Sequence, residues 1–385
     1  MTALSRMLCL DDFEAPSRRR LPRPVFGYVA GATERNDSLA DNARAFREWG
    51  FRPRVLVDVS RRTLETSLWG TAWRAPFGIA PMGLAALVAY RGDLALARAA
   101  REAGIPYMLS GSSLIPMEEV IAANPDAWFQ AYLPGDPGRI EALIARAAEA
   151  GFGTLAVTVD TAVLPNRENN VRNGFSTPLR PSARLLWDGI THPRWSLGAF
   201  LRTWARHGLP HFENSFRERG APILARNLLR DFTARDHLNW EHLALIRRIW
   251  RGRLVVKGVM RADDARRCAA AGADGVVVSN HGGRQLDGTA APLRALPEVA
   301  EAVPGLVVML DGGIRRGTDL LKAYALGAHF VFVGRPMLHA AAAYGEAGVA
   351  RAIAILRAEL MADLGLMGVA SAREMTRDLL VPLPR

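Results

Sequence analysis

A hydrophobic strand and a polar turn follow each other in the stretch Val276-Val277-Val278-Ser279-Asn280-His281-Gly282-Gly283-Arg284-Gln285-Leu286-Asp287-Gly288. The β-branched triplet at its start is typical of a buried strand. A base, His281, then precedes two glycines and a cation, Arg284. Glycine lets the backbone approach a ligand closely, and a guanidinium can bind a carboxylate through two parallel hydrogen bonds. The stretch therefore favours a site that takes a proton from an anionic substrate, although a polar loop after a core strand gives the same pattern.

Seven other short apolar segments share this form, and each ends on glycine, proline or polar residues. In chain order the full set is Phe77–Met82, Tyr107–Ser110, Trp128–Leu133, Thr154–Asp160, Leu254–Val259, Gly275–His281, Val307–Gly313 and Phe330–Arg335. Their starts lie 21 to 32 residues apart, except for a gap of 100 residues between the fourth and the fifth. Helical periodicity lies between most of them, as in Asp93–Ala103, Arg139–Ala150, Ala262–Ala271 and Thr318–Leu326. Eight β-α units predict an α/β fold of the (β/α)₈ TIM-barrel type; a doubly wound sheet is the alternative, but it gives no reason for eight units.

Residues 1–385 are predicted to form one domain with three additions to the barrel. These are a helical cap at 1–50, an insertion at 176–236 after the fourth strand, and C-terminal helices at 337–385. The insertion contains ten arginines and five acidic residues, interleaved with the aromatic residues Trp187, Trp195, Phe200, Trp204, Phe212, Phe216 and Phe232. This mixture suits a surface that touches anionic lipid without spanning the bilayer. A solvated lid over the barrel mouth, or an oligomer contact, explains it equally well.

The composition excludes several other classes of protein. Because all but two of the 49 basic residues are arginine, the net charge of +11 is weak evidence for a nucleic-acid partner. Cys9 and Cys268 are too far apart in sequence to suggest a disulfide framework or a metal site. Between His207 and His211, Gly208 and Pro210 would break the helix that a metal pair needs, so no metal is expected. The chain has no membrane-spanning apolar run and no secretory signal, so a cytoplasmic location is expected.

The two lysines of this arginine-rich chain are predicted to differ in role. Lys257 ends the apolar run in Leu254-Val255-Val256-Lys257-Gly258, where a compact, pKa-tunable ammonium would stand at a strand end. Lys322 lies in the helical segment Thr318–Leu326 and is predicted to be solvated.

Polar residues at the carboxyl ends of barrel strands are candidates for catalysis. Reading these ends along the chain gives Ser110, Gln130, Tyr132, Thr158, Asp160, Lys257, Ser279, His281, Arg284 and Asp311, with Arg167 shortly after the fourth strand. Loops after strands seven and eight commonly bind phosphate in this architecture. Gly312, Gly313 and Gly334 let backbone N–H groups converge there, and Arg315 and Arg335 add charged donors. This pattern predicts a phosphorylated cofactor or substrate.

Six motifs resemble those of the FMN-dependent enzymes that oxidise 2-hydroxy acids. That family includes glycolate and lactate oxidases and the membrane-associated L-lactate and mandelate dehydrogenases. The motifs are Phe26–Ala32, which contains Tyr28, then Phe129–Tyr132, Thr158–Thr161, Lys257–Gly258, Ser279–Gln285 and Asp311–Gly317. The resemblance covers nearly the whole chain.

The resemblance implies a role for each matching residue. His281 is the expected base, oriented by Asp160, while Tyr28, Tyr132, Arg167 and Arg284 bind the substrate. The catalytic set is therefore His281, Asp160, Lys257 and Tyr132, with Lys257 beside the N1/O2 edge of the flavin. The residues implied to bind FMN are Pro81, Met82, Gly83, Ser110, Gln130, Thr158, Lys257, Ser279, Asp311, Gly312, Gly313, Arg315, Gly334 and Arg335.

The resemblance further implies oxidation of an L-2-hydroxy acid, lactate- or mandelate-like, to the 2-oxo acid. Ser112 stands where glycolate oxidases carry tryptophan, and Gly83 is the residue that the membrane-associated dehydrogenases tend to carry. The segment Thr191–Trp195 is also similar to the insertion of those dehydrogenases. These features favour a quinone or redox protein as electron acceptor and contact of 176–236 with the inner face of the cytoplasmic membrane. The resemblance itself implies a homotetramer, because members of the family are often tetramers. The alternatives are an oxidase that reduces O₂ to H₂O₂ and a flavin-binding barrel without turnover.

Overall fold

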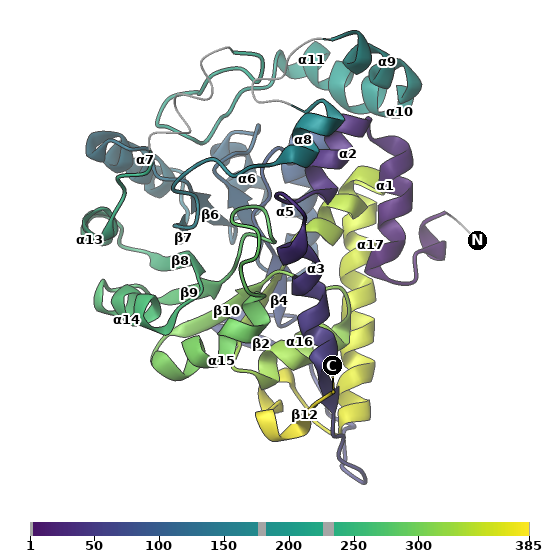
Figure 1. Ribbon diagram of the computed structural model, residues 1–385, viewed down its shortest axis with the longest axis vertical. Coiled ribbons are helices and arrows are strands. Elements are labelled where there is room, and N and C mark those ends of the chain that lie inside the picture. Colours follow the sequence, from purple (N-terminus) through teal and green to yellow (C-terminus); the bar gives the residue numbers. More distant parts are fainter. Residues whose placement is uncertain (1–2, 176–181, 226–234, 385) are drawn as a thin grey trace.

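Eight parallel strands form a barrel at the centre of the computed structural model, which describes residues 3–175, 182–225 and 235–384 (Figure 1). The strands are β4 (Phe77–Ile79), β5 (Met108–Ser110), β6 (Trp128–Ala131), β7 (Thr154–Thr158), β8 (Arg253–Val259), β9 (Gly275–Val278), β10 (Val307–Asp311) and β11 (Phe330–Val333). Their order in the sheet is β4-β11-β10-β9-β8-β7-β6-β5, and a parallel bridge between Ile79 and Tyr107 joins the two edges. All eight predicted strands are confirmed, and the doubly wound alternative is wrong.

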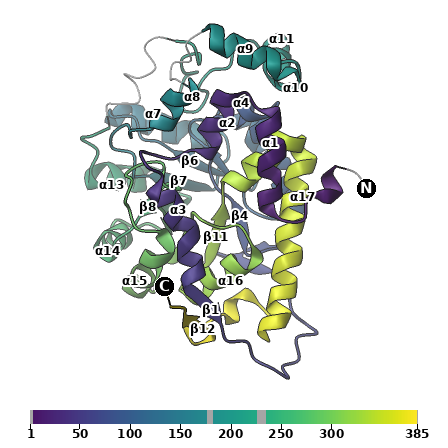
Figure 2. The same cartoon turned by 45° about the vertical axis from the view of Figure 1, so that its right-hand side comes forward.

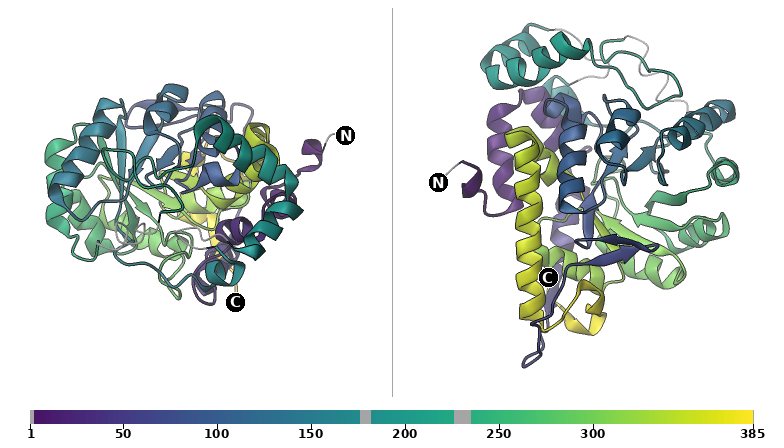
Figure 3. Two further views of the ribbon diagram at one scale, coloured as in Figure 1. Left: turned by 90° about the horizontal axis from the view of Figure 1, so that it is seen from above. Right: turned by 180° about the vertical axis from the view of Figure 1, so that it is seen from behind.

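Helices surround the barrel on all sides when it is seen from above (Figure 3). They are α4 (Ala85–Val88), α5 (Gly92–Ala103), α6 (Met117–Ala123), α7 (Pro137–Glu149), α13 (Trp240–Ile249), α14 (Ala262–Ala270), α15 (Pro292–Ala302), α16 (Gly317–Ala325) and α17 (Arg335–Met367). The four predicted helical segments are confirmed within a few residues at each end. Because helices cover the outside and side chains fill the inside, the strands are buried on both faces and consist of nearly continuous apolar runs.

Alternation along the strands divides the barrel interior into an apolar floor and a polar mouth. The floor consists of Met108, Trp128, Ala156, Val255, Val277, Met309 and Phe330, packed against Leu68 and Trp73 of the hairpin β2 (Thr66–Leu68) and β3 (Thr71–Trp73). Side chains two residues apart on a strand point to the same face. The next inward residues toward the carboxyl ends of β5 to β10 are therefore Ser110, Gln130, Thr158, Lys257, Ser279 and Asp311, all of them buried.

The N-terminal residues form short helices, and those within residues 4–30 pack beside α17 (Figure 2). These elements are η1 (Leu4–Arg6), η2 (Leu10–Phe13), α1 (Glu14–Arg20), α2 (Arg23–Ala30), α3 (Asp37–Arg44) and η3 (Ala45–Glu48). The helix α17 is broken by non-helical backbone at Gly345, so the C-terminal stretch contains two helical parts. After η5 (Ala372–Glu374) and η6 (Arg377–Leu379), the strand β12 (Leu380–Pro382) pairs antiparallel with β1 (Trp49–Phe51). The sequence pattern did not predict this strand pair.

Lys322 differs from its predicted solvated position. Its ammonium donates a hydrogen bond to the carbonyl oxygen of Phe46 at 2.8 Å and lies 5.2 Å from the ring centroid of Phe51. The second lysine of the chain therefore ties α16 to the junction between the N-terminal helices and β1.

The described part of the insertion folds into short helices that lie beyond the carboxyl ends of the strands (Figures 1 and 2). They are α9 (Ala183–Thr191), α10 (Pro193–Trp195), the π-helical turn η4 (Ser196–Leu201) and α11 (Arg202–His207), and α8 (Glu168–Asn173) precedes them. The buried indole N–H of Trp195 donates to the carbonyl oxygen of Leu87 at 2.8 Å, which anchors this layer on α4. Residues 176–181 and 226–234, with the aromatic Phe232, lie outside the described residues.

The outer surface of this helical layer is rich in exposed apolar side chains. Leu186, Trp187, Ile190 and Leu197 are 61–67% exposed, and Trp204 is 54% exposed. No helix among the described residues is long and apolar enough to cross a bilayer. As predicted, α11 ends at His207, so His211 does not share its helix. The described residues contain no group of three or more His, Cys, Asp or Glu side chains placed to hold a metal ion.

Candidate active site

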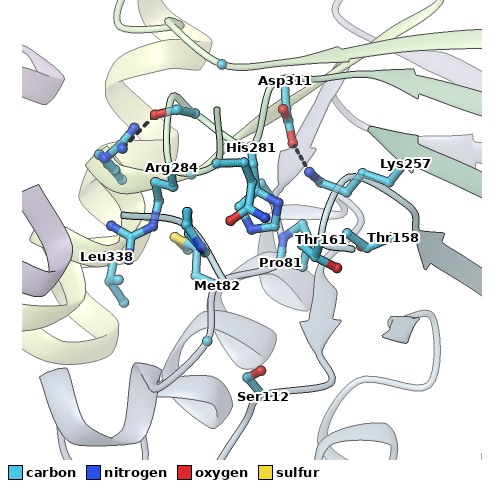
Figure 4. A pocket seen from close by; sticks show the side chains of 18 of the residues that line it. Pro81, Met82, Ser112, Thr158, Thr161, Lys257, His281, Arg284, Asp311 and Leu338 are labelled. Carbon is cyan, nitrogen blue, oxygen red and sulfur yellow. Dashed lines mark hydrogen bonds and ion pairs between the residues drawn. The ribbon is translucent and has the colours of Figure 1, made fainter. Parts of the chain in front are cut away.

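A cavity of about 260 Å³ opens at the carboxyl ends of the barrel strands. Lys257, His281, Arg284 and Asp311 point toward it from separate strands and loops (Figure 4). Sixteen of the predicted site residues line it, namely Tyr28, Pro81, Met82, Gly83, Tyr132, Thr158, Arg167, Lys257, His281, Arg284, Asp311, Gly312, Gly313, Arg315, Gly334 and Arg335. The remaining four lie behind this wall: Asp160 contacts His281, Ser110 contacts Gln130, and Ser279 contacts Lys257.

His281 is held in an unusual backbone conformation directly after β9. It has a φ of 56°, and Gly282 and Gly283 follow with φ of 64° and 74°. Left-handed backbone costs a non-glycine residue of the order of 1–2 kcal/mol, so surrounding contacts must fix it. The hydroxyl oxygen of Ser279 accepts a hydrogen bond from the His281 N–H at 3.0 Å. A Cβ atom on Gly283 would lie 2.7 Å from the backbone nitrogen of Leu39, so the helix α3 packs closely against this turn.

The imidazole of His281 lies between a carboxylate and a phenol. Its Nδ1 is 2.9 Å from Oδ1 of Asp160, and its Nε2 is 3.3 Å from the hydroxyl oxygen of Tyr132. Burial lowers the pKa of His281, while Asp160 acts in the opposite direction. For Asp160, burial works to raise the pKa, but His281 and Lys257 outweigh it and the pKa is lowered. An ionised Asp160 therefore accepts from Nδ1–H, which leaves the Nε2 lone pair of a neutral imidazole facing the cavity.

Two guanidinium groups lie side by side in the same cavity. Arg284 donates through Nη1 to the carbonyl oxygens of Tyr28 and Gly31, at 2.6 and 2.8 Å, and its Nη2 is buried with no partner among the described residues. Arg167 donates to the Arg284 carbonyl oxygen at 3.1 Å and to Oε1 of Gln285 at 2.9 Å. Burial and the neighbouring Arg284 lower the pKa of Arg167 to about 10. An anion such as a carboxylate would relieve the repulsion between these guanidinium groups.

A second cationic site lies after the last two barrel strands. Arg335 begins α17 and donates to the carbonyl oxygen of Gly282 at 2.7 Å, while its Nε is buried without a partner in the described structure. Burial, together with Arg284 and Arg315, lowers the pKa of Arg335. Gly312, Gly313 and Gly334 line the cavity beside these arginines. The start of a helix and two close cations are suited to a phosphate group.

Between these two ends runs a strip of polar side chains from the barrel mouth. Lys257 Nζ lies 3.0 Å from Asp311 Oδ2 and 3.0 Å from the Ser279 hydroxyl oxygen (Figure 4). Burial acts to lower the pKa of Lys257, but Asp311, Asp160 and Tyr132 together outweigh it and the pKa is raised. The buried atoms Gln130 Nε2, Thr158 Oγ1 and Asp311 Oδ1 have no partner among the described residues. Each such atom costs about 1–3 kcal/mol unless it is satisfied, so the strip requires a polar ligand.

These features together fit an elongated ligand with a phosphate at one end and a hydrogen-bonding ring at the other. Residues 17–382 match the FMN-dependent dehydrogenase family. The chain belongs to this family. FMN has the required shape and donor and acceptor groups, so the residues present fit the cofactor on which the family depends.

Relatives of this FMN-dependent dehydrogenase are similar over almost their whole length. An (S)-mandelate dehydrogenase of Pseudomonas putida is 38% identical over 378 residues, which cover 96% of this chain and 93% of that protein. An L-lactate dehydrogenase of Pseudomonas entomophila is 39% identical, with 96% and 97% covered. Among solved structures, the monotopic membrane protein (S)-mandelate dehydrogenase has a TM-score of 0.91 at 37% identity, covering 98% of this chain and 100% of that one. A mandelate oxidase has a TM-score of 0.81 at 34% identity, with 98% of each chain covered.

Several residues of the cavity wall were not predicted as site residues. They are Ser112, Thr161, Val163, Leu164, Phe212, Arg235, Gln285 and Leu338, together with backbone neighbours of the predicted set. Phe212 and Arg235 come from the insertion, which has no strand or helix periodicity that could place them. Arg235 is one of ten arginines in that segment, and nothing in the sequence distinguishes it from the other nine.

The charge of Asp160 can be tested through the titration of His281. Asp160→Asn retains an oxygen for Nδ1–H but removes the negative charge that raises the pKa of His281. We therefore expect this pKa to fall, so that the imidazole stays neutral to lower pH than in the unsubstituted protein. NMR titration of ¹⁵N-labelled histidine side chains would measure the change, with the spectrum of His281→Asn assigning the signal. An unchanged or higher midpoint would contradict an ionised Asp160.

Proposed function

We propose that this FMN-dependent dehydrogenase oxidises an L-2-hydroxy acid, lactate- or mandelate-like, to the corresponding 2-oxo acid. One observation carries the proposal. The cavity contains the neutral imidazole of His281, whose Nε2 faces it, and also the paired guanidinium groups of Arg167 and Arg284. The relatives named as (S)-mandelate and L-lactate dehydrogenases support the same substrate class.

In this proposal each residue contributes a separate physical effect. Arg167 and Arg284 bind the substrate carboxylate, and Tyr28 and Tyr132 hydrogen-bond the carboxylate or the reacting hydroxyl. The Nε2 atom of His281 accepts the proton that the substrate loses, and the carboxylate of Asp160 stabilises the resulting imidazolium. Bound FMN supplies the two-electron acceptor of the reaction.

The cofactor itself is assigned to the polar strip and the second cationic site. Lys257 supplies positive charge at the flavin ring, and Pro81, Met82, Gly83, Ser110, Gln130, Thr158 and Ser279 hold the ring. Asp311 accepts from the ribityl hydroxyls, and Gly312, Gly313, Arg315, Gly334 and Arg335 hold the phosphate. The unsatisfied atoms of Gln130, Thr158, Asp311 and Arg335 support this assignment.

The proton acceptor can be tested by replacing His281. In the unsubstituted holoenzyme, anaerobic addition of a 2-hydroxy acid should bleach the flavin absorbance. We expect His281→Ala to slow this bleaching by about 10²–10⁴-fold, because general-base catalysis contributes that much. The flavin content should be unchanged, since His281 is not assigned to hold FMN. Bleaching at the original rate would remove the assigned base, and failure of every 2-hydroxy acid to bleach the flavin would refute the proposed function.

We further propose that the electrons leave to a quinone or redox protein. A methyl group on Gly83 would lie 3.0 Å from Cβ of Ser112 and 3.3 Å from the hydroxyl oxygen of Tyr28, so the glycine leaves this part of the wall open. The relatives that are 38–39% identical to this chain are named as dehydrogenases, which supports this class of acceptor. The oxidase is the second candidate, because a mandelate oxidase is also similar in structure.

Mixing the reduced holoenzyme with aerated buffer separates the two acceptors. We expect flavin reoxidation by O₂ to be slower than turnover with a soluble quinone, because O₂ is not the assigned acceptor. Stopped-flow absorbance of the flavin measures both rates. Reoxidation by O₂ that keeps pace with turnover, with formation of H₂O₂, would favour the oxidase instead.

We also propose that the exposed helical layer of the insertion binds the surface of the cytoplasmic membrane. Its apolar side chains stand next to the basic residues Arg194, Arg202 and Arg206, a combination that suits anionic lipid. The structurally similar (S)-mandelate dehydrogenase is described as a monotopic membrane protein, which supports this proposal. The homotetramer remains a prediction.

Vesicle binding tests the membrane surface. We expect the triple variant Leu186→Ser, Trp187→Ser, Ile190→Ser to weaken co-sedimentation with phosphatidylglycerol vesicles at least about tenfold, because burial of each large side chain contributes about 1.5–3 kcal/mol. Val55→Ser, Leu56→Ser, Val57→Ser is the matched control, since these residues are also exposed but lie outside the insertion. Equal binding by both triple variants would place the lipid contact elsewhere.

A further inference from the structure

The helix α3 buries a polar face against the barrel mouth, which hydrophobic packing does not explain. Its two buried residues are Ser38 and Asn42, which lie one helical turn apart and are each 1% exposed. A helix that packs on a core normally buries apolar residues at this spacing. Buried polar side chains are retained where they make hydrogen bonds, so the partners of these two residues show what α3 does.

Both residues bind the segment that follows β9 and contains the base. The Ser38 hydroxyl donates to the carbonyl oxygen of Thr289 at 3.0 Å, and the carboxylate of Asp287 accepts from the Ser38 N–H at 2.9 Å. One turn later, Asn42 donates through Nδ2 to Oδ1 of Asn280 at 2.9 Å, and Nδ2 of Asn280 donates to Oδ1 of Asn42 at 2.7 Å. The helix is therefore hydrogen-bonded to this segment near both of its ends.

The amide pair fixes the turn that holds His281. The N–H of Gly283 donates to Oδ1 of Asn280 at 3.2 Å. Because an N–H can only donate, this contact identifies the Asn280 oxygen and so fixes the direction of both amides. Asn280 and Gly283 flank His281, whose φ is positive. Removal of Asn42 would break the two shortest hydrogen bonds of the Asn280 side chain and leave two longer ones, to the backbone of Gly283 and, at 3.3 Å, of Ala290.

Asn42 also packs on the loop after β10, which is assigned to the cofactor phosphate. A Cβ atom on Gly313 would lie 2.2 Å from the carbonyl oxygen of Asn42, and one on Gly312 would lie 3.4 Å from its Nδ2. Asn42 therefore lies between the turn of the base and the phosphate loop. Neither the six motifs nor the proposed mechanism includes it.

We infer that Asn42 is a positioning residue for the base His281, on which it acts through Asn280. The amide pair holds the turn Ser279–Gly283 so that the imidazole faces Asp160 and the cavity. Asn42 does not itself line the cavity. This inference rests on the proposed function, in which His281 accepts the proton of the substrate.

The titration of His281 reports where its ring lies. Burial lowers the pKa of His281, Asp160 acts to raise it, and the cations Lys257 and Arg167 add to the lowering. The remaining polar neighbour of the ring is the phenol of Tyr132. If the turn relaxes and the ring withdraws from Asp160, the raising effect weakens and the pKa of His281 must fall.

Asn42→Leu is the test variant, because leucine keeps the branched shape of asparagine and makes no hydrogen bond. Asn42→Ala is the second variant, for the case that leucine does not fit. In both holoenzymes we expect NMR titration of ¹⁵N-labelled histidine to show a lower pKa for His281. We expect anaerobic bleaching of the flavin by saturating L-lactate or (S)-mandelate to slow by about 10- to 100-fold, because a small displacement of a catalytic group has an effect of this size.

The binding of substrate should be almost unaffected. Arg167 and Arg284 keep their own backbone partners, so we expect KM to change by less than about threefold while kcat falls. Flavin absorbance shows whether each variant retains FMN.

Asn124→Leu is the matched control. Asn124 is also 1% exposed, and its side chain binds the backbone of Ala97 and Asp126, but it does not line the cavity. We expect this variant to lose stability and to keep the His281 pKa and the bleaching rate. A double variant, Asn42→Leu with Asn280→Ala, should bleach no more slowly than Asn280→Ala alone, because Asn42 acts through Asn280.

Three results would overturn the inference. The first is an unchanged or higher pKa of His281 in the Asn42 variants. The second is a loss of rate no larger than that of Asn124→Leu. The third is a double variant whose loss is the product of the two single losses, which would mean that Asn42 acts by another route. If no 2-hydroxy acid bleaches the flavin, the proposed function fails, whereas the titration and its control still decide whether Asn42 positions His281.

Discussion

The whole site depends on the alternation of side chains along six of the eight short strands, β5 to β10. In each of these strands one apolar residue forms part of the barrel floor, and the residue two places later is polar and stands on that floor. Because the floor is apolar and the helices outside exclude water, Lys257, Asp311 and Gln130 are buried without the hydration they would have at a surface. Their charges and hydrogen-bonding groups can be satisfied only by each other or by a ligand.

The second constraint is the concentration of positive charge above this floor. Arg167, Arg284 and Arg335 are all partly or fully removed from solvent, and their mutual repulsion, together with burial, lowers the pKa of Arg167 and Arg335. Folding energy from the apolar core must compensate for such an arrangement. Anions bound in the cavity would relieve this repulsion, so binding of cofactor and substrate and stability of the protein are linked.

The sequence was sufficient to predict the barrel and sixteen of the residues that line its cavity, because both depend on local patterns. Strands β5 to β10 each end in a motif whose polar residue lies two places after an apolar one, and that register fixes its direction. The Lys257–Asp311 ion pair was not predicted, since it joins two strand ends through space. Lys322 was predicted wrongly for a similar reason: its partner, the Phe46 carbonyl, is remote in sequence. The sequence predicted least about the insertion, because tertiary contacts place Arg235 and Phe212 and no periodic pattern in the sequence marks them.

The pairing of β1 with β12 has a consequence for synthesis of the chain. Tyr28 belongs to the N-terminal helices, which pack on α17 and continue into β1, whose partner strand ends three residues before the C-terminus. During translation the first helices therefore emerge long before the surfaces that receive them. The barrel strands can begin to assemble as they leave the ribosome, but the ring of Tyr28, which covers Arg284, lacks the surface of α17 until all eight strands have been made.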